Sequence, residues 1–82
     1  MADILYFGRL GDVAGTGAEK LDIPATITDT AALRRWLDAE KSASGAFLEA
    51  SVRLAVNSEI VVDPHPISPS DEIAFMPPVG GG

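Results

Sequence analysis

The residues best placed to do chemistry are the three glycines that end the sequence, because they present a carboxylate on a stretch of chain without side chains. An apolar run of strand type, residues 73–76, leads into them through two prolines and a valine. The prolines hold φ at about −65° and favour an extended path, so the chain leaves the fold in a defined direction. Residues 79–82 reach about 13 Å when fully extended. We therefore expect a folded domain over residues 1–79 and a flexible tail made of Gly80, Gly81 and Gly82.

The chemistry open to such a tail is activation of its carboxylate. A carboxylate is a poor electrophile, because oxide is a bad leaving group. A nucleotide-using partner that adenylates Gly82 would convert it into a mixed anhydride, and sulfide would then displace AMP and leave a thiocarboxylate. The tail must enter the partner's active site for this, and glycines pass through a slot too narrow for side chains. A frayed terminus without function is the alternative, but no polar linker separates the glycines from the apolar strand.

Other catalytic sets are not evident in the sequence. The chain has no cysteine, hence no thiolate nucleophile, disulfide or thiolate metal site. His65, the only histidine, stands between two prolines and is expected to form a structural corner. The acidic residues are scattered, so we expect no metal site. The glycines of residues 8–17 resemble a phosphate-binding loop, but the Gly-Lys-Ser/Thr ending of such a loop is absent.

The charge balance limits the classes of partner. The formal net charge is −6, from 12 acidic and 6 basic side chains, and no basic patch is evident. Binding to nucleic acid is disfavoured, because phosphate contacts need clustered Lys or Arg. An acidic carrier would gain association rate on a basic partner. No apolar run approaches the roughly 20 residues of a membrane span, and no secretory signal is evident. A cytoplasmic location is therefore expected.

Hydrophobic periodicity predicts strands at residues 4–7, 19–23, 52–56, 59–62 and 72–76. One amphipathic helix is expected after a cap at Thr28 or Asp29, with Trp36 as its main anchor and Arg34 among the residues on the opposite side. Residues 8–17 are expected to form an irregular turn region, and residues 46–50 are a candidate for a short second turn of helix. The order predicts an α+β domain in which one main helix packs on a mixed sheet.

One helix covers only one face of a sheet, yet the first and last strands carry apolar residues on both faces. The remaining apolar face therefore needs a second cover, and a partner protein is the expected one. On the last strand Ile73 and Phe75 share one face, and Ala74 and Met76 share the other. We expect the partner to contact the apolar residues beside the tail, namely Phe7, Met76, Pro77, Pro78 and Val79.

Three stretches resemble the small subunit of molybdopterin synthase, the MoaD-type sulfur carriers: residues 4–10 (Ile-Leu-Tyr-Phe-Gly-Arg-Leu), residues 55–57 (Ala-Val-Asn) and residues 71–82. The last of these, Asp-Glu-Ile-Ala-Phe-Met-Pro-Pro-Val-Gly-Gly-Gly, is the most specific, and the resemblance covers the whole chain. It implies a ubiquitin-like β-grasp fold. It also implies a thiocarboxylate on Gly82 that donates sulfur to precursor Z, forming the dithiolene of molybdopterin in molybdenum cofactor biosynthesis.

The resemblance implies two protein partners and no bound cofactor. The large synthase subunit holds the catalytic residues and forms a heterotetramer with the small one, which is non-catalytic alone. An adenylating enzyme of the ubiquitin-activating type uses ATP to activate the tail. The sequence departs from the family at Met76, where a second Phe is common, at Gly80, at Ser70 and at Gly11-Asp12. At Gly11 the sequence lacks the arginine that is common in the family, and with it any charge contact that this arginine makes.

Other functions stay open at this point. A sulfur carrier for thiamine synthesis or tRNA thiolation, or a ubiquitin-like protein modifier, would share the fold and the terminal Gly-Gly. The Pro-Pro-Val lead argues against the thiamine pathway. A plain interaction module would share the apolar face but would not need a free C-terminus.

Overall fold

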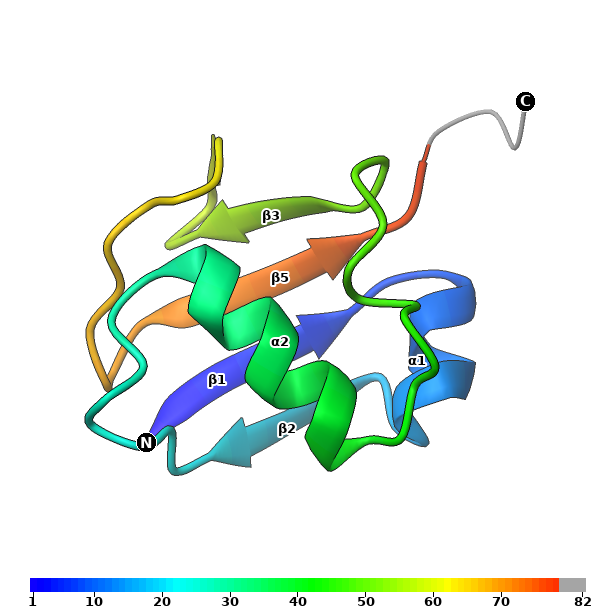
Figure 1. Cartoon of the computed structure of the whole chain (residues 1–82), viewed down its shortest axis with the longest axis horizontal. Coiled ribbons are helices and arrows are strands. Elements are labelled where there is room, and N and C mark those ends of the chain that lie inside the picture. Colours follow the sequence, from blue (N-terminus) through cyan, green and yellow to red (C-terminus); the bar gives the residue numbers. More distant parts are fainter. Residues whose placement is uncertain (79–82) are drawn as a thin grey trace.

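The computed structural model describes residues 1–78, which form a five-stranded sheet with one main helix across one face (Figure 1). The elements follow one another as β1 (Ala2–Tyr6), α1 (Arg9–Ala14), β2 (Ala18–Leu21), α2 (Thr30–Glu40), β3 (Arg53–Val56), β4 (Glu59–Val61) and β5 (Glu72–Met76). The strand order in space is β2-β1-β5-β3-β4. The central pair, β1 and β5, is parallel and the other pairs are antiparallel. The mixed sheet and single main helix confirm the predicted α+β architecture.

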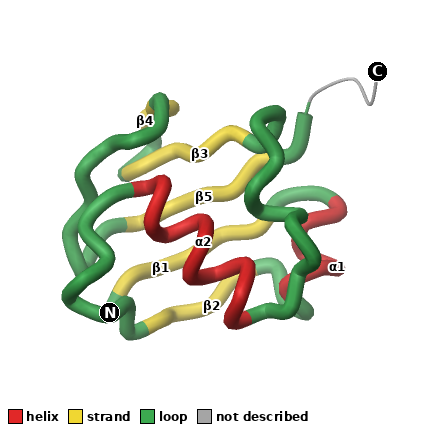
Figure 2. Tube along the Cα trace, viewed as in Figure 1, coloured by secondary structure: helices red, strands yellow, loops and turns green. Residues whose placement is uncertain are grey.

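Helix α2 begins where the sequence predicts, because the Asp29 carboxylate accepts a hydrogen bond of 2.8 Å from the Ala32 amide. Figure 2 shows the helix lying over the middle strands. Leu33 and Leu37, one turn apart, are fully buried against the sheet. Trp36 is only half-buried at the side of this stripe, so its prediction as the main anchor is wrong. The two leucines point at the sheet more directly and take that role.

Three aromatic rings fill the core at the end of the sheet where β1 and β5 finish. Phe47 lies edge-on to Phe75 at 5.2 Å between ring centroids, and Tyr6 lies within 6.0 Å of both. Such contacts add to the stabilisation from apolar burial. Tyr6 and Phe75 come from neighbouring strands, whereas Phe47 comes from the segment after α2. The trio therefore holds that segment against the end of the sheet from which the chain continues to the tail.

Two sequence predictions for connecting segments are wrong. Residues 8–17 contain the short helix α1, because Leu10 is buried in the core while Gly8 and Gly15, both with positive φ, bound the helix. Residues 46–50 form turns instead of helix. The Asp38 carboxylate accepts hydrogen bonds from the amides of Gly45 and Phe47 there, which replaces a helical pattern and lets Phe47 enter the core.

The predicted turns are confirmed. Asn57 and Ser58 both have positive φ and join β3 to β4, as two-residue hairpin loops require. Asp71 closes the turn before β5, since its amide donates to the Ser68 carbonyl and its carboxylate accepts from the Ser68 amide. Among residues 1–78, no helix is long and apolar enough to cross a membrane.

Candidate functional site

The segment that leads to the predicted tail starts at the end of β5, beside the end of β1. The Phe7 amide donates a hydrogen bond of 3.0 Å to the Phe75 carbonyl, which completes the Tyr6–Phe75 pair at the end of the β1–β5 ladder. This register places Phe7 next to Met76 on the sheet face opposite α2. Pro77 is half-buried and Pro78 is exposed. The remaining predicted site residues, Val79, Gly80, Gly81 and Gly82, lie outside the described residues.

We call the sheet face opposite α2 the open face. Its strand register aligns an apolar row across four strands, formed by Leu5, Ala74, Ala55 and Ile60. A second row, nearer the tail, contains Phe7, Met76 and Arg53. The alternation along β5 explains the two faces, because Ile73 and Phe75 are fully buried under α2 while Met76 stays half-buried on the open side.

The open face carries more apolar surface than isolated side chains would. Phe7 is 49% exposed and Ile60 is 62% exposed, although both are large hydrophobic residues. The central strands contribute Ala55 and Ala74 to this face. These side chains are small, so they do not cover Phe7 or Ile60. The predicted apolar face is thus exposed chiefly at Phe7 and Ile60, whereas Ala55 and Ala74 are buried. Large apolar side chains exposed on one face favour a protein-binding surface.

A groove of about 430 Å³ lies between the two prolines and β3. It is lined by Ala50, Ser51, Arg53, Ile60, Pro77 and Pro78. Arg53 is the one charged residue in this lining, and it sits opposite Met76 in the β3–β5 register. Pro77 and Pro78 thus lie beside mostly apolar residues and one positively charged side chain.

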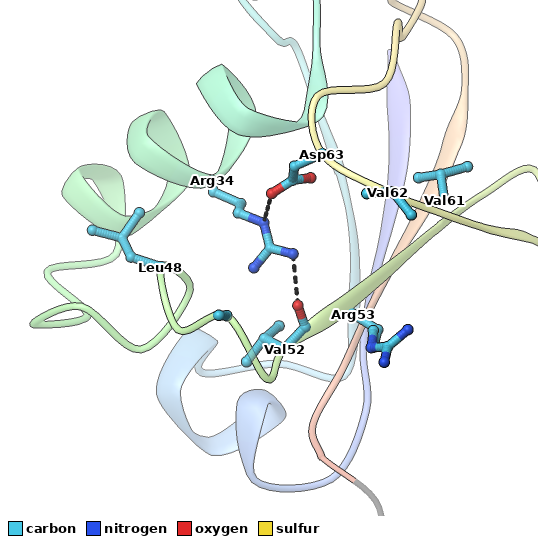
Figure 3. Close-up of a pocket in the computed structure, with 8 residues that line it drawn as sticks. Arg34, Leu48, Val52, Arg53, Val61, Val62 and Asp63 are labelled. Atoms are coloured by element: carbon cyan, nitrogen blue, oxygen red, sulfur yellow. Dashed lines mark hydrogen bonds and ion pairs between the residues drawn. The ribbon is translucent and has the colours of Figure 1, made fainter.

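Arg34 holds the segment before β3 against α2, a role that the sequence did not predict. The prediction placed Arg34 on the side of α2 away from the core, yet its side chain is only 12% exposed. Its Nη2 donates to the Val52 carbonyl at 2.6 Å, and Nη1 donates to the Phe47 carbonyl at 3.0 Å. Figure 3 shows the guanidinium between Asp63 and Val52, with Nε 2.6 Å from the Asp63 carboxylate.

No sequence signal identifies that role, because the partners of Arg34 are mostly backbone carbonyls. Arg34 lines a cavity of about 530 Å³ together with Leu48 and Val62. The contacts join α2 to the segment that precedes β3. That segment supplies Ala50 and Ser51 to the groove beside the prolines.

A second polar cluster ties β2 to the end of α2. The Tyr6 hydroxyl donates to the Glu19 carboxylate at 2.8 Å, and Lys41 Nζ lies 2.6 Å from the same oxygen. Burial, the hydrogen bond to Glu19 and its negative charge all raise the pKa of Tyr6. Burial alone would raise the pKa of Glu19, but the hydrogen bonds from Lys41 and Tyr6 and the Lys41 charge lower it overall. Near pH 7 Glu19 is therefore ionised and Tyr6 is neutral.

His65 has a structural place, as expected. Its amide donates to the Thr30 hydroxyl and its carbonyl accepts from the Thr30 amide, both at 2.9 Å, which joins the Pro-His-Pro corner to the start of α2. Within residues 1–78, no group of three or more His, Asp or Glu side chains is arranged to hold a metal ion.

Comparison with known proteins gives consistent results. The ThiS family model matches residues 4–82. The molybdopterin synthase sulfur carrier subunit of Escherichia coli is 35% identical over 83 residues, with all of both chains covered. The human protein of the same name is 31% identical, with 98% of this chain and 92% of the human one covered. The crystal structure of SAMP1 from Haloferax volcanii superposes with a TM-score of 0.78 at 20% identity, covering 99% and 98% of the two chains. At that identity the likeness to SAMP1 shows the β-grasp fold alone.

Proposed function

The chain belongs to the ThiS family, and we propose that within this family it is the sulfur carrier subunit of a molybdopterin synthase. The observation that carries the proposal is the full-length similarity to two proteins of that name, from a bacterium and from human. The β-grasp fold supports it, because the parallel strands β1 and β5 end side by side and Pro77 and Pro78 continue from that end of the sheet (Figure 1).

The proposed chemistry takes place on the carboxylate of Gly82. An adenylating enzyme of the ubiquitin-activating type transfers AMP from ATP to this carboxylate and releases pyrophosphate. Hydrosulfide then displaces AMP, giving the thiocarboxylate and a proton. The sulfur is finally donated to precursor Z, and water supplies the oxygen that restores the carboxylate. In this scheme Gly80 and Gly81 let the reacting carbon reach the active sites of its partners.

The large synthase subunit is the proposed partner of the open face. Phe7 and Met76 form the centre of this contact, with Pro77, Pro78 and Val79 leading from it toward the active site. The exposed apolar area of Phe7 and Ile60 supports this, since removing such surface from water lowers the free energy of the complex. The large subunit supplies the catalytic residues, the two subunits form a heterotetramer, and the carrier alone is not an enzyme. We place the assembly in the cytoplasm.

Intact mass spectrometry tests the carrier function directly. The protein is incubated with the adenylating enzyme, ATP and a sulfide source, and its mass should rise by the replacement of one oxygen by sulfur.

A variant that lacks Gly82 should stay folded but fail to support pterin synthesis. Its reacting carbon would lie about 3.5 Å short, and even ~1 Å of misplacement can lower a rate by about 10²-fold. Persistence of the unmodified mass with an adenylating enzyme proven active, or normal synthesis by the shortened protein, would contradict the proposal.

A further inference from the structure

We propose that Gly8 is a positioning residue for sulfur transfer: its bare Cα forms the wall against which Pro77 rests and so sets the direction in which the tail leaves the fold. The inference rests on the proposed carrier function and deepens it. Gly8 and Pro77 lie near opposite ends of the sequence, yet the parallel pairing of β1 and β5 brings the two residues side by side just beyond the sheet.

The contact at Gly8 leaves no room for a side chain. A Cβ built on Gly8 would stand 2.9 Å from Pro77 Cγ and 3.7 Å from Pro77 Cδ. Carbon atoms that are not bonded prefer separations of about 3.5–4.0 Å. Any side chain at position 8 would therefore push the Pro77 ring away, and the ring is part of the backbone at the start of the tail.

Gly8 cannot easily move to relieve such a clash, because hydrogen bonds hold the backbone on both sides of it. The Phe7 amide is bonded to the Phe75 carbonyl, and the Gly8 carbonyl accepts from the Gly11 amide at 3.1 Å. Leu10, in the first turn of α1, is buried in the core. The φ of 56° and ψ of −138° at Gly8 belong to a region that favours glycine. The position is thus a fixed point of the domain, and Pro77 is the part that would move.

A small movement of Pro77 has a large effect at the reacting carbon. A movement of Pro77 shifts the point from which the tail starts, and misplacement of a reacting carbon by even ~1 Å can lower a rate by about 10²-fold. The body of the domain is held by the open face in the proposed complex, so this displacement falls on Gly82. A side chain at position 8 should therefore slow transfer without preventing docking.

The chain offers a matched control for the backbone strain that any substitution of Gly8 brings. Gly15 ends the same helix with φ of 83°, and a Cβ built there meets nothing within 4 Å. Gly15→Ala therefore strains the backbone without touching Pro77. Gly8→Ala adds the clash, and Pro77→Ala removes the ring atoms that Gly8 contacts. Comparison of the three variants separates positioning of the tail from loss of stability.

The experiment uses thiocarboxylated protein and the large synthase subunit, and measures single-turnover sulfur transfer to precursor Z together with the Kd of the complex and the Tm of the free protein. Both Gly8→Ala and Gly15→Ala should lower Tm. Only Gly8→Ala should lower the transfer rate at saturating large subunit, by about 10- to 100-fold, while its Kd stays within about threefold of wild type. In the Pro77→Ala background, adding Gly8→Ala should change the rate by less than about threefold, because the clash is gone.

The outcomes distinguish this inference from the function on which it rests. If wild-type protein transfers no sulfur, the carrier function fails. If wild type is active but Gly8→Ala transfers as fast as Gly15→Ala, the positioning role is refuted. It is also refuted if the Gly8 substitution is as harmful in the Pro77→Ala background as in the wild-type background. Should Gly8→Ala fail to fold, the nuclear Overhauser effect between the Gly8 Hα and Pro77 Hγ protons of the wild-type complex decides: its presence supports the contact and its absence overturns it.

Discussion

At the scale of single residues, Phe7 and Met76 decide whether the open face is a docking surface. Both are large apolar side chains beside the start of the tail, and the β1–β5 ladder sets them next to each other. Methionine suits a protein contact because its side chain is flexible and polarizable. Neither residue belongs to the core under α2, so neither has to satisfy core packing as well as binding.

Met76→Asp and Phe7→Asp should each weaken binding of the large subunit by about 2–5 kcal/mol, because the carboxylate would be buried without a partner in the complex. In the free protein the same charge stays in contact with water, so Tm should change little. Leu48→Asp is the control, since Leu48 is 49% exposed, the same fraction as Phe7, but lies on the loop after α2. Titration of the large subunit against the three variants measures the effect. Unchanged binding by the first two would place the interface elsewhere, and unfolding of free Met76→Asp would place Met76 in the core.

At the scale of elements, Arg34 and Asp38 both join α2 to the segment before β3, and Arg34 does so through backbone carbonyls. That segment has no regular secondary structure over residues 46–51, and the Phe47 carbonyl accepts its hydrogen bond from the Arg34 side chain. The guanidinium provides several donors in one plane. The same segment lines the groove beside Pro77 and Pro78, so the helix indirectly shapes the exit of the tail.

Arg34→Met should lower the free energy of unfolding by about 2–4 kcal/mol, because it removes charge-assisted hydrogen bonds and leaves Asp63 without its cation. Arg35→Met is the matched control on the same helix. Arg35 is exposed, and its loss should change the free energy by no more than about 0.5 kcal/mol. Urea unfolding of both variants provides the measurement. Equal stabilities would show that the segment before β3 holds its place without Arg34.

At the scale of the whole molecule, the cluster of Tyr6, Glu19 and Lys41 makes stability depend on pH. The pKa of Glu19 is lowered in the folded protein, so the folded state favours its ionised form. The stabilisation is present above the pKa of the unfolded chain and is lost as pH falls through the lower folded value. The acid-sensitive range for this group therefore lies below about 4.5.

Glu19→Gln should reduce stability at pH 7 and flatten the fall in stability at acid pH, since the neutral amide has no proton to take up. Glu40→Gln, a change of the same kind at an exposed position on α2, should leave the acid slope close to that of wild type. Thermal unfolding of the three proteins between about pH 3 and 7 tests this, a range set by the usual carboxylate pKa of about 4.3. Parallel acid slopes for wild type and Glu19→Gln would contradict the assigned shift.

Much of the fold follows from local patterns that the sequence carries by itself. The five strands appear where apolar runs and turn residues predict them, and α2 starts at Asp29 because the cap bond joins residues only three apart. The assignment of Ile73 and Phe75 to one face of β5 needs only the two-residue period of a strand. The proposed carboxylate chemistry of the tail also rests on residue types, since it depends on glycines that carry no side chain.

The tertiary structure alone decided which distant residues meet. The parallel pairing of β1 with β5 joins segments at opposite ends of the chain, and no local pattern states that register. Arg34 finds its partners on the backbone of a loop, where side-chain identity carries no signal. Helix α1 depends on the burial of Leu10 beneath a glycine-rich stretch. For the same reason the sequence placed the tail at residues 80–82 but left the contact of Pro77 with Gly8 undetermined, because close packing between distant segments exists only once the sheet has formed.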